Sequence, residues 1–246
     1  CPHCSADVFL TDVWGFHLEM GEDSAPESVA SSYMLVMEHL MLLTAIRALW
    51  QHSDKSLVTE TLFIKDGPLT LRGQYSKLVP RLRAFFEHSR SVKRPVHVIG
   101  QEKSGRFFNH LQAIGRFAEP RRRGDPASVS VLTHEYIRNE VHRSPDLGSP
   151  YGSRTNWGEK LFVKLDPGIQ LVLNCPPGDY LSLAGHPVAS DLIGLPRILA
   201  TLPILVSHKF EGALYPIELA NGIASLSSYP SATILQRFLD AHGSSS

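Results

Sequence analysis

The chain is short of the features that mark several large classes of protein. It has three cysteines in 246 residues, which are too few and too unevenly spaced for the disulfide framework of a small secreted domain. Its 24 Lys and Arg residues are balanced by 24 Asp and Glu residues, which excludes a globally basic nucleic-acid coat and an acidic tail protein. We therefore expect a protein of the reducing cytoplasm, in which any contact with nucleic acid uses a local basic patch.

Long apolar runs and common catalytic motifs are also missing. The longest apolar run, residues 33–50, contains Glu38, His39 and Arg47, whereas a membrane helix needs about 20 mostly apolar residues. We therefore expect no membrane-spanning segment. The chain has no HExxH, no GxGxxG and no GxSxG with a suitable order of partners, which argues against zincins, Rossmann dehydrogenases and the usual serine hydrolases.

The chain begins without an initiator Met, at a Cys-x-x-Cys pair formed by Cys1 and Cys4. We expect a piece of a longer protein. The spacing is that of half a zinc knuckle, and a Zn²⁺ site needs a second Cys or His pair, which would lie upstream. An incidental pair explains the spacing equally well. We assign residues 1–26 to this half knuckle and an entry segment, and residues 27–246 to one domain.

The pattern of apolar residues predicts an α/β domain with a mixed sheet flanked by helices. Residues 27–52 form the strongest helix signal and are apolar almost all round, which predicts a central buried helix. Strands at 61–65 and 95–100 with a helix at 77–90 between them form a βαβ pattern, which predicts parallel pairing. Further helices are expected at 107–117, 135–142, 191–205, 216–226 and 231–241, and strands at 129–132, 160–165 and 169–174. The last two strands are separated by Asp-Pro-Gly, which predicts an antiparallel hairpin, and the C-terminal third is helical.

Three polar residues stand out against this framework. Asp66 follows a buried strand directly, and the carboxyl ends of parallel strands are where sites form, although Asp is also common in turns. Lys103 follows the second strand, so parallel pairing brings it to the same edge of the sheet, where it is either a phosphate ligand or a solvated loop lysine. Glu38 has only apolar helical neighbours, so it is either functional or a chance polar residue in an apolar helix. His39 beside it is typical of a core histidine.

Two loops carry candidate nucleic-acid ligands. Arg121, Arg122 and Arg123 are three adjacent positive charges, which contact a phosphate backbone or form a solvated surface run. Arg154 and Trp157 follow a Gly-, Pro- and Ser-rich stretch. Such side chains either stack on unpaired bases or anchor the loop to the core.

The order of four segments resembles the NurA nuclease domain family from about residue 30 to the C-terminus. They are residues 62–69 (LFIKDGPL), 97–105 (HVIGQEKSG), 158–164 (GEKLFVK) and 215–221 (YPIELAN).

The resemblance implies an RNase H-like fold and a manganese- or magnesium-dependent deoxyribonuclease that acts on DNA ends and single strands. It also implies a homodimer that works with a HerA-type hexameric translocase ATPase in DNA repair or in defence against phage. Asp66 matches the metal-ligating aspartate of the family, Glu38 its glutamate and Lys103 its lysine. Carboxylate oxygens are the ligands that Mn²⁺ and Mg²⁺ prefer.

The chain departs from the family pattern at two places. The family's first aspartate, on an opening strand, has no match and would lie upstream of Cys1. Asn221 stands near the position where many members carry a His, and an amide can ligate a metal or position a water but cannot act as a general base. A catalytically inactive module that binds a translocase or DNA is therefore the alternative expectation.

Overall fold

The computed structural model describes residues 4–7, 26–115, 127–143, 151–165, 169–178, 185–207, 209–210 and 212–224. Four sequence predictions lie outside these residues: Cys1, the basic run 121–123, the Asp-Pro-Gly separator at 166–168 and the helix at 231–241.

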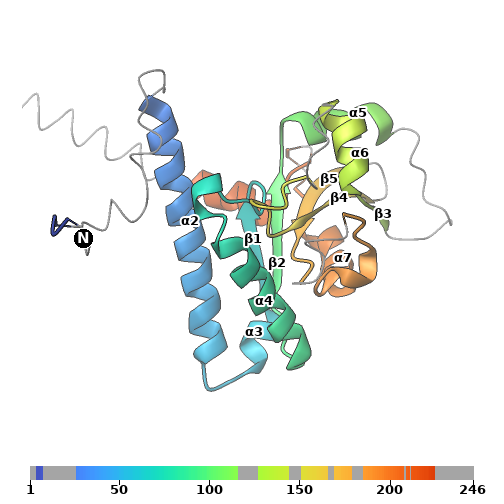
Figure 1. The fold of residues 1–246 in the computed structure, drawn as a ribbon. Helices are drawn as coiled ribbons and strands as arrows, with labels where there is room; N and C mark the ends of the chain where they lie inside the picture. Colours follow the sequence, from blue (N-terminus) through green and yellow to red (C-terminus); the bar gives the residue numbers. More distant parts are fainter. Residues whose placement is uncertain are drawn as a thin grey trace, which may run out of the picture.

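The described residues form a five-stranded mixed sheet in the order β1-β2-β5-β4-β3 (Figure 1). β1 and β2 run parallel, and every other neighbouring pair is antiparallel. The parallel pair and the antiparallel hairpin of β4 and β5 are confirmed. The strands are β1 (Leu62–Asp66), β2 (His97–Glu102), β3 (Ala127–Val131), β4 (Glu159–Leu165) and β5 (Ile169–Cys175).

The helices fall close to their expected positions. The structure adds the short helix α3 and places a π-helix, η4, after α6. Residues 215–224 are also helical. The helices are α2 (Pro26–Gln51), α3 (Ser56–Glu60), α4 (Leu78–Ser91), α5 (Arg106–Ile114), α6 (His134–Tyr136), η4 (Ile137–His142) and α7 (Leu195–Leu205), with short 3-10 turns η2 (Gly73–Tyr75) and η6 (Ala189–Asp191).

Apolar side chains pack on both faces of the sheet, because successive strand residues point to opposite sides. On one face, Val98 of β2 packs with Phe86 of α4 and Ile46 of α2. Further along the same face, α5 and η4 cover β4 and β5. On the other face, Ile99 packs with Leu195 and the rest of α7. The sheet is thus covered by helices on both sides.

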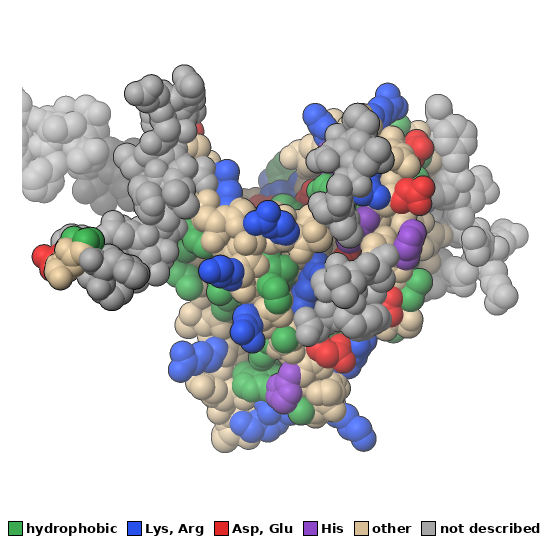
Figure 2. Space-filling view, in the orientation of Figure 1, with side chains coloured by type: hydrophobic (Ala, Val, Ile, Leu, Met, Phe, Trp, Pro, Cys, Tyr) green, Lys and Arg blue, Asp and Glu red, His purple; other side chains and the backbone are tan. Residues whose placement is uncertain are grey.

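The prediction that the long N-terminal helix is central and buried is wrong. α2 lies at the outside of the molecule (Figure 1), and Met34 and Met41 are 57% and 70% exposed. Basic and apolar side chains share the surface over α2 and α4 in Figure 2. An apolar composition all round the helix does not tell which side packs, and α2 uses only the side with Ile46.

α2 also concerns the prediction that the chain has no membrane-spanning segment. By length and composition, Glu27–Gln51 is long and apolar enough to cross a membrane. Core helices of water-soluble proteins and signal sequences have the same length and composition. Ile46 of α2 belongs to the core on the sheet. The cytoplasmic location stays a prediction.

Candidate active site

Asp66 ends β1 at a turn that is packed tightly against β2. Gly67 has a φ of +89°, which favours glycine, and its N–H donates to the carbonyl of Gln101 at 2.7 Å. A Cβ at Gly100 would lie 2.6 Å from the carbonyl oxygen of Gly67. Glycine at position 100 therefore lets the Asp66–Gly67 turn lie directly on the neighbouring strand.

Asp66 and Lys103 meet at the edge of the sheet, as the parallel pairing predicted. Asp66 is the register partner of Gln101, two residues before Lys103. The Lys103 Nζ lies 2.8 Å from Asp66 Oδ2. Both side chains remain partly exposed, at 46% for Asp66 and 31% for Lys103. A carboxylate and an ammonium group are thus presented together to a solvent-accessible ligand.

Glu38 lies in a different environment from the apolar one expected. Its side chain is 51% exposed and bonds at 2.9 Å to the Nζ of Lys65, which is 6% exposed. The same Nζ donates to the Asp66 carbonyl oxygen at 2.9 Å. Lys65 thus links Glu38 to the turn. Because strand side chains alternate, however, Lys65 and Asp66 leave opposite faces of the sheet.

The sequence analysis did not single out Lys65. A lysine inside an otherwise apolar strand is the signal that could have found it, because a buried ammonium group needs partners. Here the partners are the carboxylate of Glu38 and the carbonyl of Asp66.

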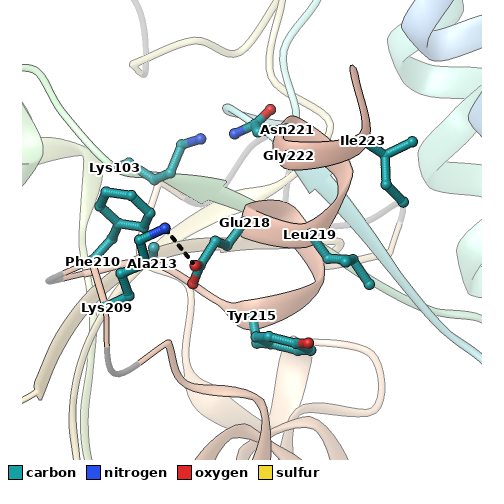
Figure 3. Close-up of a pocket in the computed structure, with 10 residues that line it drawn as sticks. All are labelled: Lys103, Lys209, Phe210, Ala213, Tyr215, Glu218, Leu219, Asn221, Gly222 and Ile223. Carbon is teal, nitrogen blue, oxygen red and sulfur yellow. Dashed lines mark ion pairs between the residues drawn. The ribbon is translucent and has the colours of Figure 1, made fainter. Parts of the chain in front are cut away.

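Asn221 and Lys103 line one cavity of about 770 Å³ (Figure 3). Asn221 lies on the helical segment 215–224 and is exposed. Gln101 ties the wall of this cavity to the sheet, because its side chain donates to the Gly212 carbonyl and accepts from the Leu214 N–H at 3.1 Å. Asp66 and Gln101 are register partners on the same face of the sheet, so the cavity lies on the Asp66 side.

A second polar group that the sequence analysis missed lies at the end of β2. The buried Lys160 bonds to the carboxylate of Glu102 and, at 3.1 Å, to the side chain of Asn174. The Asn174 amide also donates to Glu102 at 2.8 Å, and Lys160 sits 4.3 Å from the ring centre of Phe107. Burial lowers the pKa of Lys160, and the Glu102 carboxylate opposes that shift. The group therefore links β2, β4 and β5 next to Lys103.

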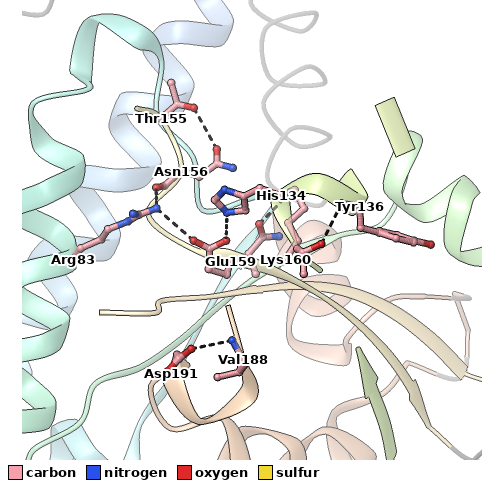
Figure 4. Close-up of polar contacts among 11 residues, drawn as sticks. Arg83, His134, Tyr136, Thr155, Asn156, Glu159, Lys160, Val188 and Asp191 are labelled. Atoms are coloured by element: carbon pink, nitrogen blue, oxygen red, sulfur yellow. Dashed lines mark hydrogen bonds and ion pairs between the residues drawn. The ribbon is translucent and has the colours of Figure 1, made fainter. Parts of the chain in front are cut away.

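A third group, Arg83, His134 and Glu159, also escaped prediction (Figure 4). His134 Nε2 lies 2.9 Å from one Glu159 oxygen, and Arg83 lies 3.6 Å from the other. Arg83 also donates to the Asn156 carbonyl at 2.6 Å. All three side chains are buried, so their mutual contacts hold the loop before β4 in place.

The prediction that Trp157 stacks on nucleic-acid bases is wrong. Trp157 is fully buried and stacks on Phe86, with ring centres 5.5 Å apart and an angle of 10°. Its indole N–H donates to His39 Nε2 at 3.3 Å. The alternative, that it anchors its loop to the core, is confirmed. Arg154 is exposed, as a phosphate ligand would need to be.

His39 is a satisfied core residue, as expected, and it makes stability depend on pH. Its Nδ1 contacts the Leu35 carbonyl at 2.7 Å, so a neutral ring donates there and accepts from Trp157. Burial lowers the pKa of His39. Because the unfolded chain then binds a proton more readily, we expect the free energy of unfolding to fall as the pH drops below about 6.5. Urea titrations from pH 8 to 5 measure this.

A matched pair of variants isolates the contribution of His39. His39→Phe should reduce the pH dependence of the free energy of unfolding, because one of the groups that resist protonation is gone, while burial still lowers the pKa of His97 and of His142. His52→Gln, at an exposed position, should leave it unchanged. Equal slopes for His39→Phe and the unsubstituted chain would contradict this origin.

The predicted ligands Asp66 and Glu38 meet the requirements of a divalent-ion site only in part. Among the described residues, no three His, Cys, Asp or Glu side chains gather as a metal cluster. Asp66 offers one exposed carboxylate, and Mg²⁺ and Mn²⁺ are often held by one or two carboxylates together with water and substrate phosphates. Asp66 would therefore hold such an ion. Glu38 contacts Lys65, whose side chain leaves the opposite face of the sheet from Asp66, so the two carboxylates are not placed to share one ion. For zinc, Cys4 is exposed and Cys175 is buried far from it in sequence.

Comparisons with family models, with curated proteins and with solved structures give no match for this chain.

Proposed function

We propose that the chain is a metal-dependent DNA nuclease of the NurA type with an RNase H-like fold. The observation that carries the proposal is the Asp66–Lys103 pair, at 2.8 Å, where parallel β1 and β2 end beside a cavity. The five-stranded mixed sheet with helices on both faces is compatible with the RNase H-like part of the proposal. DNA is the proposed substrate, and Mn²⁺ or Mg²⁺ the proposed cofactor.

The proposed chemistry divides between three side chains. Asp66 would hold the divalent ion, which when bound activates water and offsets charge on the scissile phosphate. Lys103 would bind a phosphate oxygen, because its Nζ lies beside the Asp66 carboxylate. Asn221, in the same cavity, would orient a water or donate its amide N–H to the phosphate. An amide cannot take up a proton at neutral pH, so we assign Asn221 no role as a general base.

Lys103→Gln tests the role of the lysine. We expect cleavage of end-labelled single-stranded DNA with Mn²⁺ to slow by about 100-fold, because a charge that stabilises the developing phosphate charge is removed. Lys55→Gln, an exposed lysine in the loop after α2, is the matched control and should cleave normally. Normal cleavage by Lys103→Gln would overturn its assignment.

The proposed partners are a HerA-type hexameric ATPase and a second copy of the chain, in DNA end processing or defence against phage. Support comes from α2, where exposed Tyr33, Met34, Leu40 and Met41 offer an apolar surface to a protein partner. Light scattering of the protein alone and with such an ATPase tests both. A monomer that forms no complex would contradict this part.

The second candidate is a catalytically inactive module that binds a translocase or DNA. It is favoured by one observation: Asp66 and Glu38 are each bonded to a lysine. Binding of DNA or of the ATPase without any Mn²⁺- or Mg²⁺-dependent cleavage would support the module. Cleavage that requires Lys103 would support the nuclease.

A further inference from the structure

The cavity beside Lys103 has two kinds of wall. Tyr215, Leu219 and Ile223 follow one side of the helical segment 215–224, while Lys103 lies on the other side of this segment (Figure 3). Its volume of about 770 Å³ lies in the usual range for pockets that hold a small organic group. A ligand with a flat apolar part and a charged part matches this division.

Tyr215 presents a large aromatic ring to this cavity. The side chain is 55% exposed, at the start of the helical segment 215–224. Phe210, another exposed aromatic residue of the lining, has Lys209 Nζ 5.0 Å from its ring centre. Exposed aromatic rings at a nucleic-acid site are stacking platforms for bases, and each stacked base contributes a measurable part of the affinity.

Lys209 supplies an ammonium group to the lining of the same cavity. It is 73% exposed, and among the described residues the carboxylate that it pairs with is that of Glu218, with one oxygen 4.0 Å away. The other oxygen of Glu218 is engaged by the Ser207 hydroxyl. The weak contact leaves Lys209 able to turn toward an anion, and Lys103 supplies a second ammonium group in the same lining.

Gln101 fixes the position of the backbone before Tyr215 relative to Asp66. The side chain of Gln101 bonds at both ends to the backbone of Gly212 and Leu214, directly before Tyr215. Gln101 is also the register partner of Asp66. Gly212 has a φ of +70°, and a Cβ there would lie 2.4 Å from the Phe108 ring, so this connection is tightly packed. A nucleotide on Tyr215 would therefore lie at a set distance from Asp66.

We infer that this cavity is a subsite for one unpaired nucleotide, with its base on Tyr215 and its phosphate on Lys209. The inference rests on the proposed function, and it deepens it. A base inside a duplex has both faces covered by its neighbours, so only an unpaired base reaches the ring. The subsite thus selects single strands and frayed ends.

Binding without divalent metal tests this inference. The probe is a fluorescein-labelled oligothymidylate of about 12 nucleotides in EDTA, read by fluorescence anisotropy, with a duplex of matched length beside it. Tyr215→Ala should weaken binding of the single strand by about 10-fold, because one stacking interaction is lost. Tyr215→Phe keeps the ring and should bind within about twofold of the unsubstituted chain.

The same anisotropy assay measures the control variants and distinguishes the alternative outcomes. Leu78→Ala removes an exposed apolar side chain on α4, 50% exposed, and should leave binding unchanged, as should Tyr215→Ala with the duplex. Equal single-strand binding by Tyr215→Ala and the unsubstituted chain would overturn the inference, as would no binding at all. Binding that depends on Tyr215 without Mn²⁺-dependent cleavage would uphold the subsite and refute the nuclease. Mn²⁺-dependent cleavage together with single-strand binding that is equal in Tyr215→Ala and the unsubstituted chain would support the nuclease and refute the subsite.

Discussion

Asp66→Asn should lower Mn²⁺-dependent cleavage of DNA by about 1,000-fold or more, since a bound metal supplies several kcal/mol of transition-state stabilisation. The amide keeps the size of the side chain and removes the charge that would hold the ion. The backbone of the turn is held independently, by the Gly67 N–H on Gln101 and by Lys65 on the Asp66 carbonyl. The fold should therefore survive, and the loss should be specific to the reaction.

The control for this variant is Asp54→Asn. Asp54 is an exposed carboxylate in the turn before α3, where it bonds Ser56, and it should have no effect on cleavage. Cleavage is measured on end-labelled single-stranded DNA with each purified variant, alongside circular dichroism to check the fold. Activity that persists in Asp66→Asn would show that the cleavage site lies elsewhere.

Trp157→Ala should lower the free energy of unfolding by about 3–5 kcal/mol, the usual cost of removing a large buried aromatic side chain. Trp157 is completely buried, stacks on Phe86 and donates to His39. Removing it leaves a cavity between the loop, α4 and α2, and leaves His39 Nε2 without this donor. Urea denaturation followed by circular dichroism measures the change.

Two further variants separate packing from nucleic-acid binding at this loop. Trp157→Phe should cost about 1–2 kcal/mol, because most of the ring packing remains while the hydrogen bond is lost. Arg154→Ala, in the exposed part of the loop, should leave stability unchanged. Full stability of Trp157→Ala together with weaker DNA binding would restore the stacking role that the structure rejects.

The strands and the site edge were predictable because their signals are local. Residues of β1 and β2 are short apolar runs with a helical segment between them, and such units pair in parallel. Parallel pairing then places the residue that ends β1 beside the loop after β2. That Asp66 and Lys103 come to the same edge of the sheet follows from this rule, and the structure adds their contact.

Burial was not predictable where it depends on distant partners. Trp157 is buried by Phe86 and by His39, which lies 118 residues away in the chain. α2 is apolar on every side, so its sequence does not say that only one side would pack on the sheet. In both cases tertiary packing decides which apolar side chain is covered, and no local pattern records that choice.

Charged residues inside apolar strands were the clearest sequence signal that the prediction did not use. Lys65 in β1 and Lys160 in β4 interrupt apolar strands, and each has a carboxylate partner, Glu38 and Glu102. A charged residue in a buried strand requires such a partner, because unpaired burial is costly. The partners themselves lie far away in sequence, so only the need for a pair was visible.

Mn²⁺ binding measured by electron paramagnetic resonance tests the central claim most directly. The account predicts that the unsubstituted chain with single-stranded DNA lowers the signal of free Mn²⁺ below that of the same DNA alone, that Asp66→Asn adds nothing to the effect of the DNA, and that Asp54→Asn behaves like the unsubstituted chain. Equal Mn²⁺ binding by Asp66→Asn and the unsubstituted chain, or no binding by either, would contradict a metal site at Asp66.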